Sequence, residues 1–369
     1  MNRCFYALIV VIAQTLSIDL SAQKTKQLIQ TPASDTRIEY TGRTFVNDDD
    51  VSYDWSGVYL RVKFEGTYLA MKCSDTKNTW FNLWVDKEMS PVADKKFLVG
   101  AKDTIIVLAE GLKRGTHEII LQKRTEADEG LFTVSSFISE GEILQAAGRK
   151  NRHIEFVAAS YACGYGVESS SKNDLFLAET ENCNLTYAAI AARYFDADFS
   201  LVCHSGQGIA RNFNSKTPGY YMPDRYKQTF DNNKEVEWKA SAASYTPDVV
   251  VINLGGNDFS CGLQPSENSF RKNYIRLLMD IKANYGEKIP ILCMVPANPN
   301  IYDYISNAVA FSQLKNVAYM VLSKYAYDSV DETGAHNHPN YKGQLKVASC
   351  MIPYVSTLTG WEMPQKPYR

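Results

Sequence analysis

The sequence predicts a protein of the α/β class with two domains: an all-β sandwich or barrel, followed by a three-layer α/β/α domain with a parallel sheet. Its 369 residues are too many for one typical domain and suit two. Residues 36–145 alternate apolar and polar side chains between turns and lack helical spacing, which is typical of a sandwich. From residue 153 onward, short apolar strands alternate with helical segments, which indicates a parallel sheet covered by helices. We expect the β domain at residues 23–145 and the α/β/α domain at residues 146–369.

Residues 1–22 have the pattern of a secretory signal peptide. Arg3 gives a positive start, and residues 5–18 are largely apolar but too few to span a bilayer. Ser21 and Ala22 supply small residues before a cleavage site at Gln23. No later run of 18 apolar residues exists, so we expect a secreted protein, periplasmic or extracellular, without a membrane span.

The composition excludes several classes of protein. With 45% hydrophobic and 22% charged residues, the chain has the composition of a globular protein and not of a disordered one. Its 39 basic and 41 acidic residues lack the basic excess that a nucleic-acid partner normally requires. Seven of the eight cysteines follow the leader, at wide spacings and without a cysteine–histidine cluster, so no structural metal is expected. In an exported protein these cysteines could form one or two disulfides, whose pairing the sequence does not assign.

Six segments of the first domain show the alternation of strands, about 10 to 15 residues apart. They are residues 58–64, 68–73, 81–86, 104–108, 116–123 and 131–138. Residues 141–152 are polar and basic, and we expect them to link the domains.

The second domain is expected to contain at least four strands and three helices. The strands are residues 154–158, 199–203, 248–254 and 291–295, of which the third is apolar on both faces, as in a buried parallel strand. The helices are residues 185–195, a segment between a cap at Ser266 and a stop at Gly286, and residues 341–358. Ligand sites of such sheets lie beyond the carboxyl ends of the strands, which directs attention to the residues that follow each strand.

Three of these strands are followed by a residue with useful chemistry. Ser160 comes just after the strand 154–158, where its hydroxyl could act as a nucleophile or only cap a helix. Gly206, after the second strand, could bring a backbone N–H close to a ligand, or form a plain turn with Gly208. Asn257, after the third, could donate its amide to a developing oxyanion or stabilise its own turn.

His338, before the last helix, is the candidate base. A histidine within reach of Ser160 could accept its proton and later protonate the leaving group. His336 could form a metal-binding pair with it, but the sequence offers no apparent third ligand. Each residue alone has an ordinary structural explanation. Together, a nucleophile, two oxyanion donors and a base at one sheet edge form the set that acyl transfer needs.

The order Ser, Gly, Asn, His between residues 160 and 338 resembles the SGNH (GDSL-type) hydrolase superfamily. Five segments are similar, more narrowly, to carbohydrate esterase family 2: ASYACGYGVE (159–168), LTYAAIAARYF (185–195), HSGQGIARN (204–212), PDVVVINLGGNDFS (247–260) and HPNYKGQ (338–344). That family joins an N-terminal jelly-roll sandwich to an SGNH domain and removes acetyl groups from plant polysaccharides such as xylan and glucomannan. The resemblance is detailed over residues 153–361, whereas the first domain matches only in length and strand character.

Carried over residue by residue, the resemblance implies a serine esterase that forms an acyl-enzyme. Ser160 matches the nucleophile, the Gly206 N–H and the Asn257 amide match the oxyanion hole, and His338 matches the general base. No metal and no cofactor are implied, and the expected partner is an acetylated polysaccharide or oligosaccharide.

Two departures from the superfamily pattern bear on activity. Ala158-Ala159 stands where Gly-Asp usually precedes the serine, and the added Cβ could shift the nucleophile. Ala335-His336 stands where an Asp often precedes the base. His338 would then be oriented by a backbone carbonyl, as a Ser–His dyad, or by Asp331. Because losing a triad carboxylate typically lowers the rate by roughly 10⁴, the chain has a substitute or is a slow enzyme.

Other functions are open at this point. The same residues could hydrolyse another acyl ester, of a lipid, an aryl alcohol or peptidoglycan. The chain could also be a non-catalytic glycan-binding protein on a decayed esterase fold, which the two departures support and the presence of all four site residues argues against. A purely structural sandwich adaptor would leave residues 153–361 unexplained. Trp80, Trp84 and Trp238 could stack on sugar rings, although core packing is the more common role of each.

Overall fold

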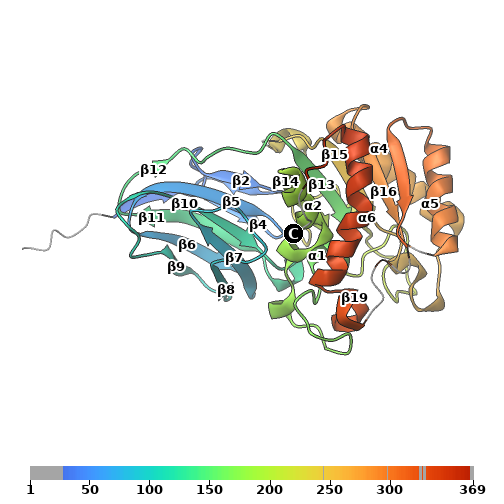
Figure 1. Ribbon diagram of the computed structural model, residues 1–369, viewed down its shortest axis with the longest axis horizontal. Coiled ribbons are helices and arrows are strands. Elements are labelled where there is room, and N and C mark those ends of the chain that lie inside the picture. The colour runs from blue at the N-terminus through green and yellow to red at the C-terminus, as the bar shows by residue number, and fades with distance from the viewer. Residues whose placement is uncertain (1–27, 244, 297, 324–325, 327–329, 366–369) are drawn as a thin grey trace, which may run out of the picture.

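The computed structural model describes residues 28–365 except 244, 297, 324–325 and 327–329, and shows two domains side by side (Figure 1). The expected leader, residues 1–22, lies outside the described residues. Among the helices of the described part, none is long and apolar enough to cross a membrane.

The first domain is a sandwich of two antiparallel sheets (Figure 1). One sheet consists, in spatial order, of β3 (Phe45–Asn47), β4 (Asp50–Tyr53), β11 (Phe132–Ser139), β6 (Leu69–Asp75) and β9 (Thr104–Ala109), with β1 (Ile29–Pro32) also paired to β11. The other consists of β12 (Ile143–Leu144), β5 (Tyr59–Gly66), β10 (Gly115–Lys123), β7 (Thr79–Val85) and β8 (Lys95–Val99), with β2 (Glu39–Thr41) also paired to β5.

All six strands expected in the sandwich are present, as β5, β6, β7, β9, β10 and β11. The further strands β1 to β4, β8 and β12 are short, and several show little alternation of burial; β3, for example, is exposed throughout. Because an apolar pattern marks only strands that bury one face, the sequence does not reveal them. β12 lies within the expected linker, so residues 143–144 still belong to the sandwich.

The second domain is a parallel sheet of five strands between two layers of helices. Its spatial order is β14 (Asp198–Cys203), β13 (His153–Ala158), β15 (Val249–Asn253), β16 (Ile291–Val295) and β17 (Val317–Val321). One layer contains α2 (Tyr187–Phe195) and α6 (Tyr341–Thr359), and the other contains α4 (Glu267–Tyr285) and α5 (Pro299–Ser312). Successive residues of β13 serve opposite layers, because Phe156 belongs to the core under α2 and α6, and Val157 to the core under α4 and α5.

The expected strands and helices of this domain are all present, with ends within two residues of the prediction. Ser266 caps α4 as predicted, since its side chain accepts a hydrogen bond from the Ser269 N–H at 3.2 Å, and Gly286 follows the last turn with φ 91°. The sequence does not predict α5 or β17. As the outermost strand on its side, β17 is mostly half-buried or exposed, so it lacks the continuous apolar run of the central strands.

The outer face of the second sandwich sheet covers β14, the edge strand of the parallel sheet. The Tyr59 hydroxyl donates to Asp198 Oδ1 at 2.6 Å, and Arg61 Nη2 donates to the same oxygen at 3.3 Å. The Tyr59 ring also lies 6.1 Å from that of Phe199. These contacts explain why most of β5 is buried on both faces, unlike a strand with one face in water.

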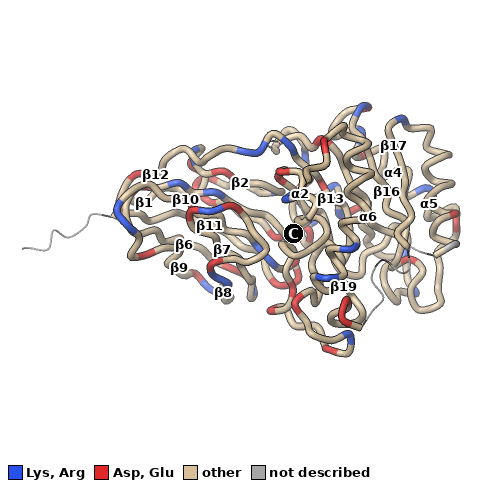
Figure 2. The backbone as a smooth tube through the Cα atoms, in the orientation of Figure 1, with Lys and Arg blue, Asp and Glu red and all other residues tan. Residues whose placement is uncertain are grey.

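Acidic and basic residues do not form separate regions (Figure 2), and the described cysteines are not paired in disulfides. Figure 2 shows basic and acidic residues interspersed along both domains. All seven cysteines of the described residues are free thiols, so the disulfides that the sequence left open are not formed among them.

Candidate active site

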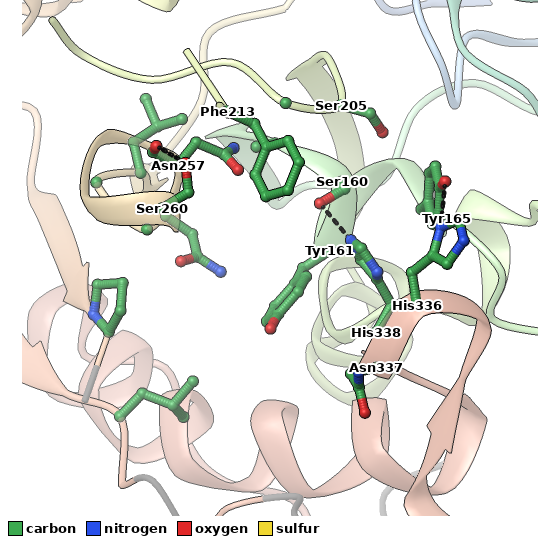
Figure 3. Close-up of a pocket in the computed structure, with 18 of the residues that line it drawn as sticks. Ser160, Tyr161, Tyr165, Ser205, Phe213, Asn257, Ser260, His336, Asn337 and His338 are labelled. Atoms are coloured by element: carbon green, nitrogen blue, oxygen red, sulfur yellow. Dashed lines mark hydrogen bonds between the residues drawn. The ribbon is translucent and has the colours of Figure 1, made fainter. Parts of the chain in front are cut away.

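A pocket of about 880 Å³ opens at the carboxyl ends of the parallel strands (Figure 3). All four predicted site residues line it: Ser160, Gly206, Asn257 and His338. The first three follow β13, β14 and β15, three neighbouring strands, and His338 precedes α6. The parallel sheet thus brings together residues that are far apart in the sequence.

Ser160 and His338 are in direct contact. Ser160 begins α1 (Ser160–Cys163), a single helical turn that ends at Gly164 in the left-handed conformation, φ 84°. A Cβ at Gly164 would lie 2.4 Å from the backbone of Asn182, so only glycine fits there. The Ser160 side chain, 8% exposed, places Oγ 2.9 Å from Nε2 of His338 (Figure 3).

The other ring nitrogen of His338 fixes its tautomer. Nδ1 lies 3.2 Å from the carbonyl oxygen of Ala335. A carbonyl oxygen can only accept, so Nδ1 carries the proton and Nε2 presents its lone pair to the Ser160 hydroxyl. The Tyr165 ring lies over the imidazole at 4.4 Å, and the Tyr161 ring meets it edge-on at 5.5 Å. A carbonyl and two aromatic rings therefore orient the imidazole.

The suggestion that Asp331 orients the base is corrected by this geometry. The Asp331 carboxylate is 72% exposed and faces Lys342 Nζ at 3.6 Å. Between the two orienters that the sequence left open, the structure has the backbone carbonyl of Ala335.

The surroundings keep the His338 imidazole neutral. Burial lowers the pKa of His338 from its ordinary 6.5 to about 4; nearby His336 acts in the same direction, and hydrogen bonds with the backbone of Ala335 and His336 oppose it. A neutral imidazole with a free lone pair is the form that can act as a general base near pH 7.

Gly206 and Asn257 lie on loops that are tied to each other. Asn257 Nδ2 donates to the Gln207 carbonyl at 2.8 Å, which leaves a second amide hydrogen for a ligand. Gly206 has φ 76°, and within the described chain no acceptor takes a hydrogen bond from its N–H. Both donors are therefore free to bind an oxygen in the pocket.

Asp258, next to Asn257, holds the two loops together. It is fully buried, and its carboxylate accepts three backbone N–H groups at 2.7–2.9 Å: those of Ile209, Ala210 and Arg211. Burial raises the pKa of Asp258 to about 6, and these hydrogen bonds oppose the shift. Asp258 thereby connects the loop after β15 to the loop after β14.

With Ala158-Ala159 before it, Ser160 Oγ still lies 2.9 Å from His338 Nε2. Ala158 ends the buried strand β13, and Ala159 has an extended backbone with φ −126°. Both conformations are open to any residue with a Cβ, so the exchange introduces no backbone strain.

Three aromatic side chains of the pocket were not predicted from the sequence: Tyr161, Tyr165 and Phe213 (Figure 3). Phe213 is 58% exposed and lines the pocket. The two tyrosines lie one and five residues after Ser160 in the segment 159–168, and that proximity was the available signal.

The tryptophans proposed as a sugar platform lie elsewhere and are not among the residues that line this pocket. Trp84 is fully buried, and Trp238 is buried with its ring 4.8 Å from the Arg43 guanidinium. Trp80 packs under the Lys96 ammonium at 5.4 Å. The prediction that these three rings stack on a sugar in this pocket is therefore wrong.

One group of three metal-ligating side chains occurs within the described residues: Glu126, Cys163 and Glu181, with ligand atoms within 4.8 Å of one another. Burial raises the pKa of the Glu181 carboxyl and of the Cys163 thiol well above their ordinary values. Metal ions bind the deprotonated forms of both groups, so this cluster is poorly suited to a cation.

A Ser–His pair, with the Gly206 and Asn257 N–H groups in the same pocket at the carboxyl edge of a parallel sheet, defines a serine hydrolase of the SGNH class. The family model described as GDSL-like lipase/acylhydrolase matches residues 159–351, more than half of the chain, and the model described as carbohydrate esterase 2 N-terminal matches residues 40–147. A solved family two carbohydrate esterase from Clostridium thermocellum, in complex with cellohexaose, is 30% identical with a TM-score of 0.79, covering 88% of this chain and 100% of that one. The chain therefore belongs to carbohydrate esterase family 2.

Two curated proteins are also similar. The cellulase/esterase CelE of Acetivibrio thermocellus is 34% identical over 270 residues, which are 72% of this chain but 32% of CelE. The chain thus spans about a third of the length of CelE. An acetylxylan esterase / glucomannan deacetylase of Cellvibrio japonicus is 28% identical over 326 residues, 84% of this chain and 86% of that protein.

Proposed function

We propose that the protein removes O-acetyl groups from a plant cell-wall polysaccharide of the xylan or glucomannan type, and that it does so outside the cytoplasm. The observation that carries this proposal is the 2.9 Å contact between Ser160 Oγ and His338 Nε2 in a pocket that also presents Gly206 and Asn257. The names of the relatives support the substrate class, since one is an acetylxylan esterase / glucomannan deacetylase and another binds cellohexaose. The leader-like residues 1–22 support the location.

In the first half of the reaction, Ser160 Oγ attacks the acetyl carbonyl carbon while His338 Nε2 accepts the hydroxyl proton. The carbonyl oxygen becomes an oxyanion and receives hydrogen bonds from the Gly206 N–H and the Asn257 amide, each worth about 3 kcal/mol in such sites. The imidazolium then gives its Nε2 proton to the departing sugar oxygen, which leaves acetyl-Ser160.

In the second half, Nε2 accepts a proton from water, and the hydroxide formed attacks acetyl-Ser160. The tetrahedral intermediate collapses, Ser160 regains its proton from His338, and acetate leaves. The Ala335 carbonyl keeps the Nδ1 proton in place throughout. It selects the same tautomer as a triad carboxylate, but its partial charge stabilises the imidazolium less.

The substrate class is tested by acetate release from acetylated xylan, acetylated glucomannan and 4-nitrophenyl acetate and butyrate, with the Ser160→Ala variant as blank. We expect the wild type to deacetylate at least one polysaccharide. Turnover of the aryl esters alone would shift the proposal to another acyl ester. No turnover, together with glycan binding in affinity electrophoresis, would make the chain a glycan-binding protein.

The low pKa of His338 predicts activity in acid. A general base acts in its unprotonated form, so kcat/KM should be constant above the pKa and fall about tenfold per pH unit below it. We expect the midpoint of this fall near pH 4, well below the ordinary 6.5 of histidine. It is measured as kcat/KM for 4-nitrophenyl acetate from pH 3.5 to 7.5, with folding followed by circular dichroism. A midpoint above pH 6 in folded protein contradicts the prediction.

A further inference from the structure

A loop of the sandwich domain reaches the residues that form the pocket. It follows β10 and contains the short helix η1 (Ala127–Glu129) and, just before it, Glu126. Glu126 is 4% exposed, and its Oε2 accepts a hydrogen bond from the Ser205 N–H at 2.7 Å. Ser205 and Gly206 both line the pocket. A carboxylate of the first domain thus holds the residue that precedes the oxyanion donor.

The pocket loop, residues 204–208, has no helix or strand of its own. Beyond Ser205, the Gly206 carbonyl accepts from the Phe213 N–H at 2.8 Å, and the Gln207 N–H turns back to the His204 carbonyl at 3.3 Å. Glu126 holds the loop from the other side, before Gly206. The direction of the Gly206 N–H depends on the backbone angles of Ser205, so a fixed Ser205 N–H restricts where the Gly206 N–H points.

A second carboxylate of the sandwich supports the same loop from further away. The His204 Nδ1 lies 2.5 Å from Asp231 Oδ2. The Asp231 N–H in turn donates at 2.8 Å to Asp54 Oδ1, which belongs to the sandwich. The first domain therefore contacts the start of this loop directly through Glu126 and indirectly through Asp54.

The groups around Glu126 suit a buried carboxylate. The neighbouring Glu181 accepts the Glu126 N–H at 3.2 Å through Oε2, and burial, followed by the charge of Glu126, raises the pKa of Glu181 well above its ordinary value. The fully buried Lys123 ammonium donates to the carbonyls of Thr125 and Glu126 at 2.6 and 3.0 Å, which adds positive charge nearby. Hydrogen bonds from N–H to a carboxylate are roughly twice as strong as neutral ones.

We propose that Glu126 is a positioning residue of the oxyanion hole, through which the sandwich domain holds the Gly206 N–H toward the acyl oxygen. This inference rests on the proposed esterase function of Ser160 and Gly206. It gives the first domain a part in the reaction besides any part in glycan binding. A displacement of about 1 Å at a catalytic group can cost about 10²-fold in rate, and one oxyanion donor is worth about 10²–10³ in kcat, so the effect should be measurable.

Three substitutions of Glu126 distinguish the effect of side-chain length from the effect of the negative charge. Glu126→Gln keeps the length and an oxygen that can accept from Ser205, but loses the charge. Glu126→Asp keeps the charge but is one methylene shorter, and Glu126→Ala loses both. Tyr59→Phe is the matched control, since it removes another buried hydrogen bond between the domains, the 2.6 Å bond to Asp198 at the amino end of β14.

Two readouts are needed: kcat and KM for 4-nitrophenyl acetate, and amide hydrogen exchange of a peptide that covers residues 204–208. For Glu126→Ala and Glu126→Asp we expect kcat to fall about 10- to 100-fold with KM within about threefold, and exchange of this peptide to rise. Glu126→Gln should stay within about fivefold of the wild-type kcat. Tyr59→Phe should lower the melting temperature and leave both kcat and the exchange of residues 204–208 unchanged.

The proposal is overturned if Glu126→Asp and Glu126→Ala keep the wild-type kcat, or if Tyr59→Phe lowers kcat as much as they do. It is also overturned if exchange at residues 204–208 does not change. If Glu126→Ala does not fold, the test is the comparison of kcat and of hydrogen exchange between Glu126→Gln and Glu126→Asp. The exchange readout needs no turnover, so an inactive wild type would refute the esterase function while the exchange result still decides whether Glu126 holds the loop.

Discussion

Replacement of Ser160 by alanine is expected to lower kcat for 4-nitrophenyl acetate by about 10⁴ to 10⁶. The variant lacks the Oγ that forms the acyl-enzyme, whereas His338 and both oxyanion donors stay in place. Any remaining hydrolysis would come from water that attacks an ester whose carbonyl oxygen is held in the oxyanion hole, a route that typically retains about 10³–10⁴ over the uncatalysed reaction. KM should change little, because no binding contact to the acetyl group is removed. The measurement is steady-state hydrolysis, with the burst of 4-nitrophenol as a count of acylated sites.

Ser205 provides the matched control for this substitution. It lines the same pocket, and its Oγ is buried without a hydrogen-bond partner in the described part of the chain. Loss of an unpaired hydroxyl should be nearly neutral, so Ser205→Ala is expected to keep kcat within about threefold. A burst of 4-nitrophenol in the Ser160→Ala variant, or its loss in the Ser205→Ala variant, would show that Ser160 is not the nucleophile.

The elements that the sequence predicts well are those whose burial is patterned along the chain. β15 is apolar on both faces because helices cover both sides of the sheet, and α4 has its cap at Ser266 and its stop at Gly286. Both features are local in sequence. By contrast, β3 is exposed throughout, and β17 lies at the end of the sheet. Their pairing depends on neighbours that fold elsewhere, and no local pattern marks them.

The candidate site divides in the same way. Ser160, Gly206 and Asn257 could be located because each follows a predicted strand, and the parallel sheet places the ends of its strands at one edge. For the partner of His338 Nδ1 the sequence left two alternatives, because the Ala335 carbonyl is a backbone group that every residue possesses. Glu126 was beyond reach for another reason: it lies in the other domain, and only the packing of the two domains brings it to Ser205.

Replacement of His338 by alanine is expected to lower kcat by about 10⁴ to 10⁶, as for Ser160. Without the imidazole, the Ser160 hydroxyl has no acceptor at 2.9 Å and must attack with its proton in place. His336 is the matched control: it lies two residues away and lines the same pocket, but its Nδ1 bonds to the Tyr165 hydroxyl at 2.9 Å. We expect His336→Ala to lower kcat at most about tenfold and Asp331→Asn to leave it within about twofold. A large loss in Asp331→Asn would show that a carboxylate orients the base after all.

The double variant Ser160→Ala/His338→Ala tests whether the two residues act as one unit. In such a unit, removing the second member costs little once the first is gone, because neither has a function without the other. We therefore expect kcat of the double variant to lie within about threefold of either single variant, and the multiplied loss of independent groups should not appear. A further large loss in the double variant would mean that His338 contributes apart from Ser160, for example by activating water directly. The Ser–His contact would then be part of the fold rather than the centre of the reaction.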